Sequence, residues 1–180
     1  RMLIRRYAPG DRAAVAGLDV ATDVSSIAAL RLVDEQFTWS EVPLAVTRTK
    51  QHHLAEYLGE DPVSWDVGFV AVLDAKVVGF AAASLSDWNR RLVLQHLYVA
   101  GRVRRQGVGM ALLRAVLSSE PARGAEHVWL ETQVDNVPAI RAYEQMGFRV
   151  VGLDQTLYGD REATDTAVFM SQPLSHPDGP

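Results

Sequence analysis

The run from Arg104 to Gly109, Arg-Arg-Gln-Gly-Val-Gly, places two cations and two glycines just before a helical pattern that begins at Met110. The first turn of a helix leaves about four backbone N–H groups without partners and carries about half a positive charge, so it attracts anions. Gly107 and Gly109 let the backbone approach a ligand closely, and the two arginines can pair with phosphate oxygens. The sequence therefore predicts a phosphate-binding loop, with a solvated basic turn as the alternative. The residues concerned are Arg104, Arg105, Gln106, Gly107, Val108 and Gly109.

A second candidate segment runs from Asn136 to Phe148 and has the pattern of one short capped helix. Asn136 is a strong N-cap residue, Pro138 is tolerated in a first turn, and Gly147 suits the left-handed position after the last turn. The helix places Tyr143 near the face that also carries Asn136. Tyr143 is either an ordinary core residue or a hydroxyl available to chemistry, and its own position leaves both alternatives open.

The spacing of apolar residues predicts the elements that must position these two segments. Runs rich in β-branched residues flank Asp74-Ala75-Lys76 and predict a hairpin, and a further strand ends just before the glycine loop. Strand–helix–strand crossovers bury both faces of a sheet, so this order favours a mixed α/β sheet with helices on both faces. The predicted strands are Met2–Tyr7, Val67–Leu73, Val77–Leu85, Arg91–Val99, Val128–Thr132, 148–157 and 164–173; helices are predicted over 110–118 and 137–146.

The first third of the chain has a more helix-like pattern. Asp11 can cap a helix that carries Val15 and Leu18. A second helix is predicted near Ser25–Val33, an irregular connector over Phe37–Val46, and a third helix over Thr47–Leu58.

Composition limits the classes of protein that the chain can represent. Its 180 residues are 48% hydrophobic and 22% charged, which suits one domain over 1–174 with a flexible tail over 175–180. The net charge of −4 makes nucleic acid an unexpected partner, and the absence of cysteine excludes disulfides and thiolate ligands. No metal is expected. No apolar run reaches the roughly 18 residues of a membrane span, and the amino terminus lacks the core of a signal peptide, so a cytoplasmic protein is expected.

Taken together and in this order, the two segments resemble the GNAT superfamily of N-acetyltransferases. Arg104-x-x-Gly107-x-Gly109 is similar to the family's pyrophosphate loop, and Asn136-x-x-Ala139-x-x-x-Tyr143-x-x-x-Gly147-Phe148 is similar to its later motif. The resemblance implies an α/β fold with a mixed, mostly antiparallel sheet of about seven strands, helices on both faces, and a splay between the fourth and fifth strands. Within the superfamily, Leu130-Glu131-Thr132-Gln133 and later segments are similar to the streptothricin acetyltransferases.

The resemblance also implies a co-substrate, acetyl-CoA, and residues that would bind it. Backbone amides of Arg105–Gly109 would bind the pyrophosphate, and Asn136 would cap its helix and contact the pantetheine arm. The strand residues Leu97, Tyr98 and Val99 would pair with the pantetheine arm and polarise the thioester carbonyl. Tyr143 occupies the position of the tyrosine that protonates the leaving thiolate in the family.

The sequence offers two candidates for the residue that accepts a proton from the acceptor amine. An alkyl ammonium has a pKa of about 10.4, so a nearby base is useful at pH 7. Many family members have an acidic residue at the strand position that His96 occupies here, and a neutral histidine can replace it as a proton acceptor. Glu131 is the second candidate. The alternatives are that His96 is a packed bystander and that Glu131 anchors a neighbouring loop.

The acceptor itself is predicted to be a small cationic molecule. Acidic and aromatic side chains could form a pocket that favours cations. Three functions are therefore considered: an acetyltransferase for a small-molecule amine such as streptothricin, an acetyltransferase for protein amino groups, and a non-catalytic acyl-CoA sensor. Whether the chain forms a homodimer is left open. The pocket candidates are Asp34, Glu35, Asp87, Glu131, Asp154, Phe37, Trp39 and Trp88.

Overall fold

Two units make up the chain, and they alternate along the sequence. The computed structural model describes residues 1–59, 64–159 and 166–175. The first unit comprises Arg1–Ala21, Gln51–Val128 and Pro173–Pro180, and the second comprises Thr22–Lys50 and Trp129–Gln172. The single domain expected over 1–174 stays a prediction. Apart from Ser175, the predicted tail lies outside the described residues.

The first unit contains four antiparallel strands in the order β1-β4-β5-β6. Asp74 and Ala75 both have positive φ, 49° and 62°, and form the two-residue turn between β4 and β5. This is the hairpin predicted around Asp74-Ala75-Lys76. The strands are β1 (Met2–Arg6), β4 (Val67–Leu73), β5 (Lys76–Ser86) and β6 (Arg91–Val99).

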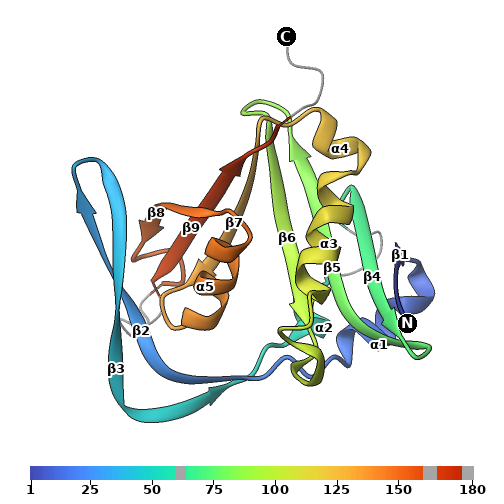
Figure 1. Ribbon diagram of the computed structural model, residues 1–180, viewed down its shortest axis with the longest axis horizontal. Coiled ribbons are helices and arrows are strands. Elements are labelled where there is room, and N and C mark those ends of the chain that lie inside the picture. The colour runs from blue at the N-terminus through green and yellow to red at the C-terminus, as the bar shows by residue number, and fades with distance from the viewer. Residues whose placement is uncertain (60–63, 160–165, 176–180) are drawn as a thin grey trace. The chain divides into compact units, whose positions relative to one another are not determined.

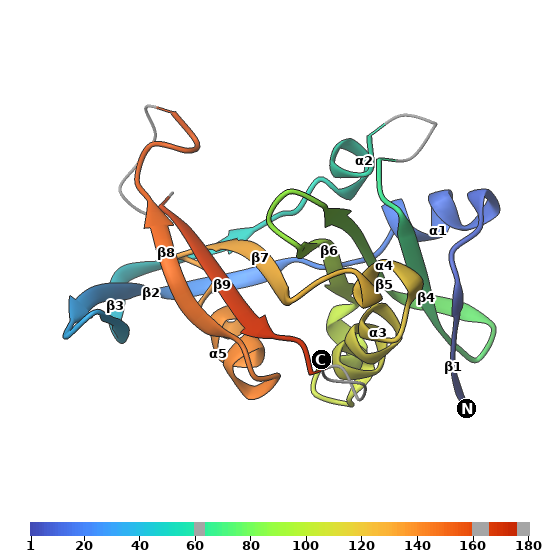
Figure 2. The same ribbon diagram turned by 90° about the horizontal axis from the view of Figure 1, so that it is seen from above.

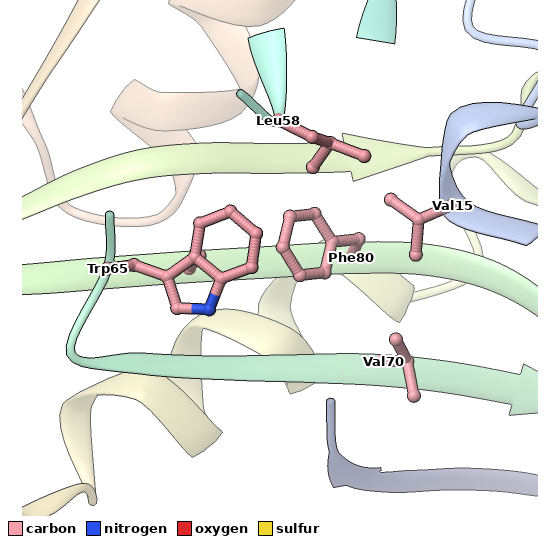
Figure 3. Close-up of a cluster of buried hydrophobic side chains, with 6 residues drawn as sticks. Val15, Leu58, Trp65, Val70 and Phe80 are labelled. Atoms are coloured by element: carbon pink, nitrogen blue, oxygen red, sulfur yellow. The ribbon is translucent and has the colours of Figure 1, made fainter. Parts of the chain in front are cut away.

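Helices cover both faces of these four strands. One face carries a core of Val15, Leu58, Trp65, Val70, Phe80 and Ala82, in which Phe80 lies between Trp65 and Val15 (Figure 3). Gly79, next to Phe80 on β5, faces the opposite side of the sheet, because successive residues of a strand face alternate sides. A Cβ at Gly79 would lie 2.9 Å from Leu112 and 3.2 Å from Val108, so helix α3 packs closely on that second face. The helices are η1 (Pro9–Asp11), α1 (Arg12–Ala16), α2 (Leu54–Tyr57), η2 (Gly101–Val103), α3 (Val108–Leu117) and α4 (Glu120–Arg123).

The second unit combines a long hairpin with three strands and one helix. Strands β2 (Thr22–Val33) and β3 (Gln36–Lys50) form the hairpin seen in Figure 1. Strand β7 (His127–Gln133) enters the unit at Trp129, and the order beyond it is β7-β9-β8. Helix α5 (Val137–Gln145) lies beside β8 (Arg149–Asp154) and β9 (Ala167–Pro173) in both views (Figure 2).

The predictions for residues 25–58 are mostly wrong. The expected helix Ser25–Val33 and connector Phe37–Val46 are the two strands of the hairpin, and only Leu54–Tyr57 of the expected helix Thr47–Leu58 is helical. The turn explains the difference, since Asp34 and Glu35 both adopt positive φ, 49° and 63°, as a tight hairpin turn requires. Buried and less buried residues alternate over the first half of β2, as in a strand. In the sequence, the neighbouring alanines made this alternation look like a helical pattern.

The predicted fold class is confirmed. The chain is mixed α/β, its seven sheet strands β1, β4–β9 are mostly antiparallel, and β4 and β6 have the predicted bounds. The predicted splay between the fourth and fifth strands stays a prediction.

Candidate functional site

The predicted phosphate-binding loop leads into the N-terminus of α3. Gly107 is the N-cap residue, adopts the left-handed conformation with φ 81°, and provides no side-chain cap. Arg105 also has positive φ, 60°. Main-chain N–H groups of turns that contain left-handed residues can form a concavity that binds anions. The first backbone N–H groups of α3 therefore point out of the helix without an intrahelical acceptor.

The two arginines of the loop have different surroundings. The Arg104 guanidinium donates to the carbonyl oxygens of Val99 (3.3 Å) and Ala21 (3.1 Å), so it fastens the loop to the end of β6. Arg105, Gln106 and Gly107 are exposed. Arg105 is thus the loop cation that faces solvent, and Arg104 is the residue that orders the backbone.

Strand β6 contains a bulge directly before the predicted pantetheine-binding residues. Ala82 of β5 lies opposite His96, whereas Ala83 lies opposite Leu94, so Gln95 is an extra residue in β6. A bulge of this kind bends a strand and redirects the following side chains. Leu97, Tyr98 and Val99, all half-buried, follow it and lead to the loop.

His96 is packed in an aromatic cluster. Its side chain lies among Trp65, Phe80 and Tyr98, with ring centroids 5.6, 5.8 and 5.7 Å away, and the residue is 8% exposed. His96 Nδ1 lies 3.2 Å from the Tyr98 hydroxyl. Burial disfavours the imidazolium and lowers the pKa of His96 to about 4. The imidazole is therefore neutral at pH 7 and is a weak proton acceptor.

We expect stability to depend on pH through His96. The pKa is about 4 in the folded state and about 6.5 in the unfolded state, so between these values the unfolded chain binds more protons. The contribution of the neutral imidazole to stability is complete above pH 6.5 and is lost as the pH falls toward 4; the loss is about 2.5 kcal/mol at pH 4.5. Urea unfolding of His96→Phe at pH 4.5 and 7 should show a correspondingly smaller difference than the unmodified protein. Equal pH dependence in the two proteins would contradict this account.

The second predicted segment forms helix α5 as expected. The Asn136 side chain caps it by accepting from the Ala139 N–H at 3.4 Å, and Pro138 lies in the first turn. Gly147 adopts φ 98° after the last turn. A Cβ at Gly147 would lie 2.8 Å from Oε1 of Gln172, the movable end of a long side chain, so it is the positive φ that favours glycine there.

Tyr143 lies on α5 with its ring 5.7 Å from that of Phe148. Burial raises the pKa of Tyr143 to about 12, so the hydroxyl is a hydrogen-bond donor throughout the neutral range. The other side of the helix is tied to strand β3, because Trp39 Nε1 donates to Glu144 at 2.7 Å and Arg141 pairs with Glu41. The hairpin therefore fixes the helix that carries Tyr143.

Glu131 is exposed on β7 and is held by a residue that the sequence did not single out. The Tyr158 hydroxyl donates to Glu131 Oε1 at 2.5 Å. Gln133 and Asp135, also missed, continue this set of polar contacts. No local spacing signals such a group, since its members come from β3, β7 and the segment after β8.

The residues proposed for an acidic pocket have separate local roles. Asp34 and Glu35 form the β2–β3 turn, and Asp87 lies in the β5–β6 turn. Asp154 accepts from the Thr156 N–H at 2.7 Å, which lowers the pKa of Asp154. The aromatic candidates also differ, since Trp39 donates a hydrogen bond to Glu144, Phe37 is half-buried and Trp88 is 89% exposed.

The predicted site residues are divided between the two units. The first unit holds His96 and the run from Leu97 to Gly109, and the second holds Glu131, Asn136 and Tyr143. Within the residues described, no cluster of three or more His, Asp or Glu side chains has the arrangement of a metal site. No helix in the described ranges combines the length and apolar character needed to cross a membrane.

Comparison with known proteins identifies the family. The profile of the acetyltransferase (GNAT) family matches residues 26–148. Streptothricin acetyltransferase from Streptomyces lavendulae is 38% identical over 94% of this chain and 93% of its own length. An N-alpha-acetyltransferase from Sulfurisphaera tokodaii is 33% identical over 59% of this chain and 68% of its own length.

Solved structures agree with this assignment. The crystal structure of nourseothricin acetyltransferase is 36% identical, covers 97% of this chain and 99% of its own, and has a TM-score of 0.80. A Bacillus anthracis protein assigned as a streptothricin acetyltransferase, solved in complex with acetyl coenzyme A, covers 96% and 99% with a TM-score of 0.84. At 21% identity, the latter supports the fold alone. By its motifs, its fold and its similarity over almost its whole length, the chain belongs to the GNAT family of acetyltransferases.

Proposed function

We propose that this protein transfers an acetyl group from acetyl-CoA to a primary amine of a small cationic molecule of the streptothricin type. The observation that carries the proposal is the 38% identity with a streptothricin acetyltransferase, which extends over 94% of the chain. The similarity thus includes the hairpin β2–β3 and the segments around Glu131, not only the loop before α3.

The residues of the loop suit a pyrophosphate. Gly107 is left-handed, exposed and has nothing within 4 Å of the place where a Cβ would stand, so a ligand can approach the backbone there. The N-terminus of α3 has no side-chain cap that an anion would have to displace. In this proposal Arg105 to Gly109 bind the pyrophosphate, with the arginine side chain adding a cation.

The residues proposed to bind the pantetheine arm come from the end of β6 and the start of α5. Leu97, Tyr98 and Val99 follow the bulge in β6 and would bind the pantetheine arm through their backbone. A main-chain N–H from this run would polarise the thioester carbonyl. Asn136 caps α5 with its side chain and is proposed as a further contact of the same arm.

The reaction requires the movement of two protons. Acetyl-CoA supplies an activated thioester, whose carbonyl carbon accepts the amine nitrogen as the C–S bond breaks. Glu131 is proposed to take the proton that the ammonium must lose, because it is exposed and is oriented by Tyr158, whereas His96 is buried among aromatic rings. Tyr143 is proposed to stabilise and protonate the sulfur. Since the pKa of Tyr143 is about 12 and that of a free thiol is about 8.5, transfer of the phenol proton to the thiolate is uphill by about 5 kcal/mol, so the main contribution proposed for Tyr143 is a hydrogen bond that stabilises the thiolate.

Replacing Tyr143 by phenylalanine tests the last assignment. The change removes the hydroxyl and keeps the ring contact with Phe148 at 5.7 Å, so the fold should be retained. We expect kcat to fall by about 10² because general acid catalysis contributes 10²–10⁴, while the Kd of acetyl-CoA changes little. An unchanged kcat in steady-state thiol-release assays would remove Tyr143 from the mechanism.

A screen of acceptors tests the proposal as a whole. Thiol release from acetyl-CoA is measured with streptothricin-class antibiotics, aminoglycosides, polyamines and peptides with free amino termini. The proposal expects the highest kcat/KM with a streptothricin-class amine and an acetylated product of the corresponding mass. Activity confined to peptides would contradict it, as would tight acetyl-CoA binding without turnover of any amine.

A further inference from the structure

A continuous series of hydrogen bonds in the second unit ends at Glu131. Lys50 at the end of β3 donates to Asp135 Oδ1 at 2.8 Å and to Gln133 Oε1 at 3.4 Å. Gln133 Nε2 donates to the Tyr158 hydroxyl at 3.0 Å, and this hydroxyl donates to Glu131 Oε1 at 2.5 Å. Five side chains from three parts of the sequence are therefore connected.

The buried carboxylate of Asp135 holds Lys50, and Lys50 in turn fixes the direction of the hydrogen bonds. Its side chain is 0% exposed and accepts from both Lys50 and Arg48, the latter at 2.9 Å. Lysine has no acceptor, so the Gln133 oxygen must face it and the Gln133 amide nitrogen must face Tyr158. The Tyr158 hydroxyl then accepts from Gln133, and its single proton is left for Glu131. No member of the series can reverse its direction without losing a bond.

The same geometry leaves Glu131 available to a ligand. Tyr158 binds Oε1, and no partner of Oε2 is found in the part of the chain that the structure describes. Trp129, Glu131 and Gln133 alternate with the buried residues of β7 and so share one face. Trp129 stacks on Phe169 of β9, with ring centroids 5.1 Å apart, which gives this face an aromatic surface next to the carboxylate.

We infer that Tyr158 is a positioning residue for the acceptor, holding Glu131 so that its second oxygen binds the ammonium group. This inference rests on the proposed function. A carboxylate near aromatic rings suits an alkyl ammonium, which both groups attract. Without the Tyr158 hydroxyl the exposed Glu131 side chain has several rotamers, and the amine is bound less tightly.

The state of Tyr158 is consistent with this role. Burial and the neighbouring Glu131 carboxylate raise the pKa of Tyr158, so the phenol keeps its proton. It therefore acts as a permanent donor to Glu131 rather than as a second base. Tyr158, which lies outside both family motifs, would in this way contribute to the specificity of the site for a cationic acceptor.

Tyr158→Phe in the full-length protein tests the inference. We expect the KM for the amine to rise about tenfold, since a hydrogen bond to a charged group is lost. The KM for acetyl-CoA and the thermal midpoint should stay unchanged. Tyr57→Phe is the matched control, because Tyr57 is an exposed tyrosine of the first unit, and it should leave both KM values unchanged.

A double-mutant cycle separates positioning from a general structural effect. In the Glu131→Ala background, which also lacks the proposed base, amine binding is measured directly, and Tyr158→Phe should change the Kd of the amine by less than about twofold because its partner is already absent. Persistence of the tenfold effect in that background, or a parallel rise in both KM values, would overturn the inference while leaving the acetyltransferase activity intact. If the unmodified protein acetylates none of the screened amines, the proposed function fails first and this inference with it.

Discussion

Replacing Gly107 by valine is expected to weaken acetyl-CoA binding by about 100-fold. The residue has φ 81°, a region that costs an L-residue roughly 1–2 kcal/mol and a β-branched residue more. The loop can relieve the strain only by leaving the left-handed conformation, which turns the N–H groups at the start of α3 away from one another. A valine side chain would also occupy the open space beside Gly107 through which, in the proposed function, the pyrophosphate would approach. Isothermal titration with acetyl-CoA measures the effect directly.

Gly59 provides the matched control for this change. It is also left-handed, with φ 66°, and also has nothing within 4 Å of a Cβ position, but it follows α2. Gly59→Val should therefore meet a similar backbone strain and leave the Kd of acetyl-CoA unchanged. Equal losses of affinity in both variants would show that the effect is a general loss of stability and would contradict a phosphate-binding role for the loop.

Removing both cations around Asp135 is expected to cost about 3–5 kcal/mol of unfolding free energy. In the Arg48→Met, Lys50→Met double variant, the carboxylate, which is 0% exposed, loses both ion-pair partners. A buried charge without compensation is strongly destabilising. For a chain of this size the thermal midpoint should fall by about 10 °C or more. Urea and thermal unfolding would measure the change, and a loss below about 1 kcal/mol would contradict it.

A third substitution at the same place provides the control. Asp135→Leu added to the double variant removes the stranded charge, and well-packed apolar residues often replace a buried ion pair at little cost. We expect it to recover a large part of the lost stability. If the triple variant is less stable than the double variant, the cost lies in packing or in capping of α5 rather than in the buried charge.

The later part of the chain was predictable because its signals are local. A two-residue turn, a glycine N-cap and an asparagine cap each act within a few residues, and they place β4–β5, α3 and α5 correctly. The hairpin β2–β3 was missed because its strands are paired with each other over eleven registered residue pairs rather than marked by composition. Its alanines and leucines favour a helix in isolation, and long-range pairing overrides that preference.

The residues of the candidate site likewise fall into those with a local sequence signal and those without one. The loop residues and Tyr143 belong to motifs with short spacings, which a sequence reveals. The hydrogen-bond series that ends at Glu131 is not revealed in this way, because its members Tyr158 and Lys50 stand 27 residues after Glu131 and 81 residues before it. Likewise, nothing local indicated that His96 would be enclosed by Trp65 and Phe80, so only the structure lowers its pKa.

The alternation of the two units has a consequence for biosynthesis. Residues 22–50 leave the ribosome well before Trp129–Gln172, the other half of their unit. At about 5–20 residues per second, the hairpin waits on the order of 10 s for α5 and β7–β9. During that interval Trp39 and Glu41 lack Glu144 and Arg141. The hairpin also carries the apolar side chains Leu32, Val33, Val42 and Val46, which are exposed in the completed fold as well. A nascent chain stalled near residue 128 would therefore present a long hairpin without its partner helix, and the open edges of its two strands are a surface that aggregates readily.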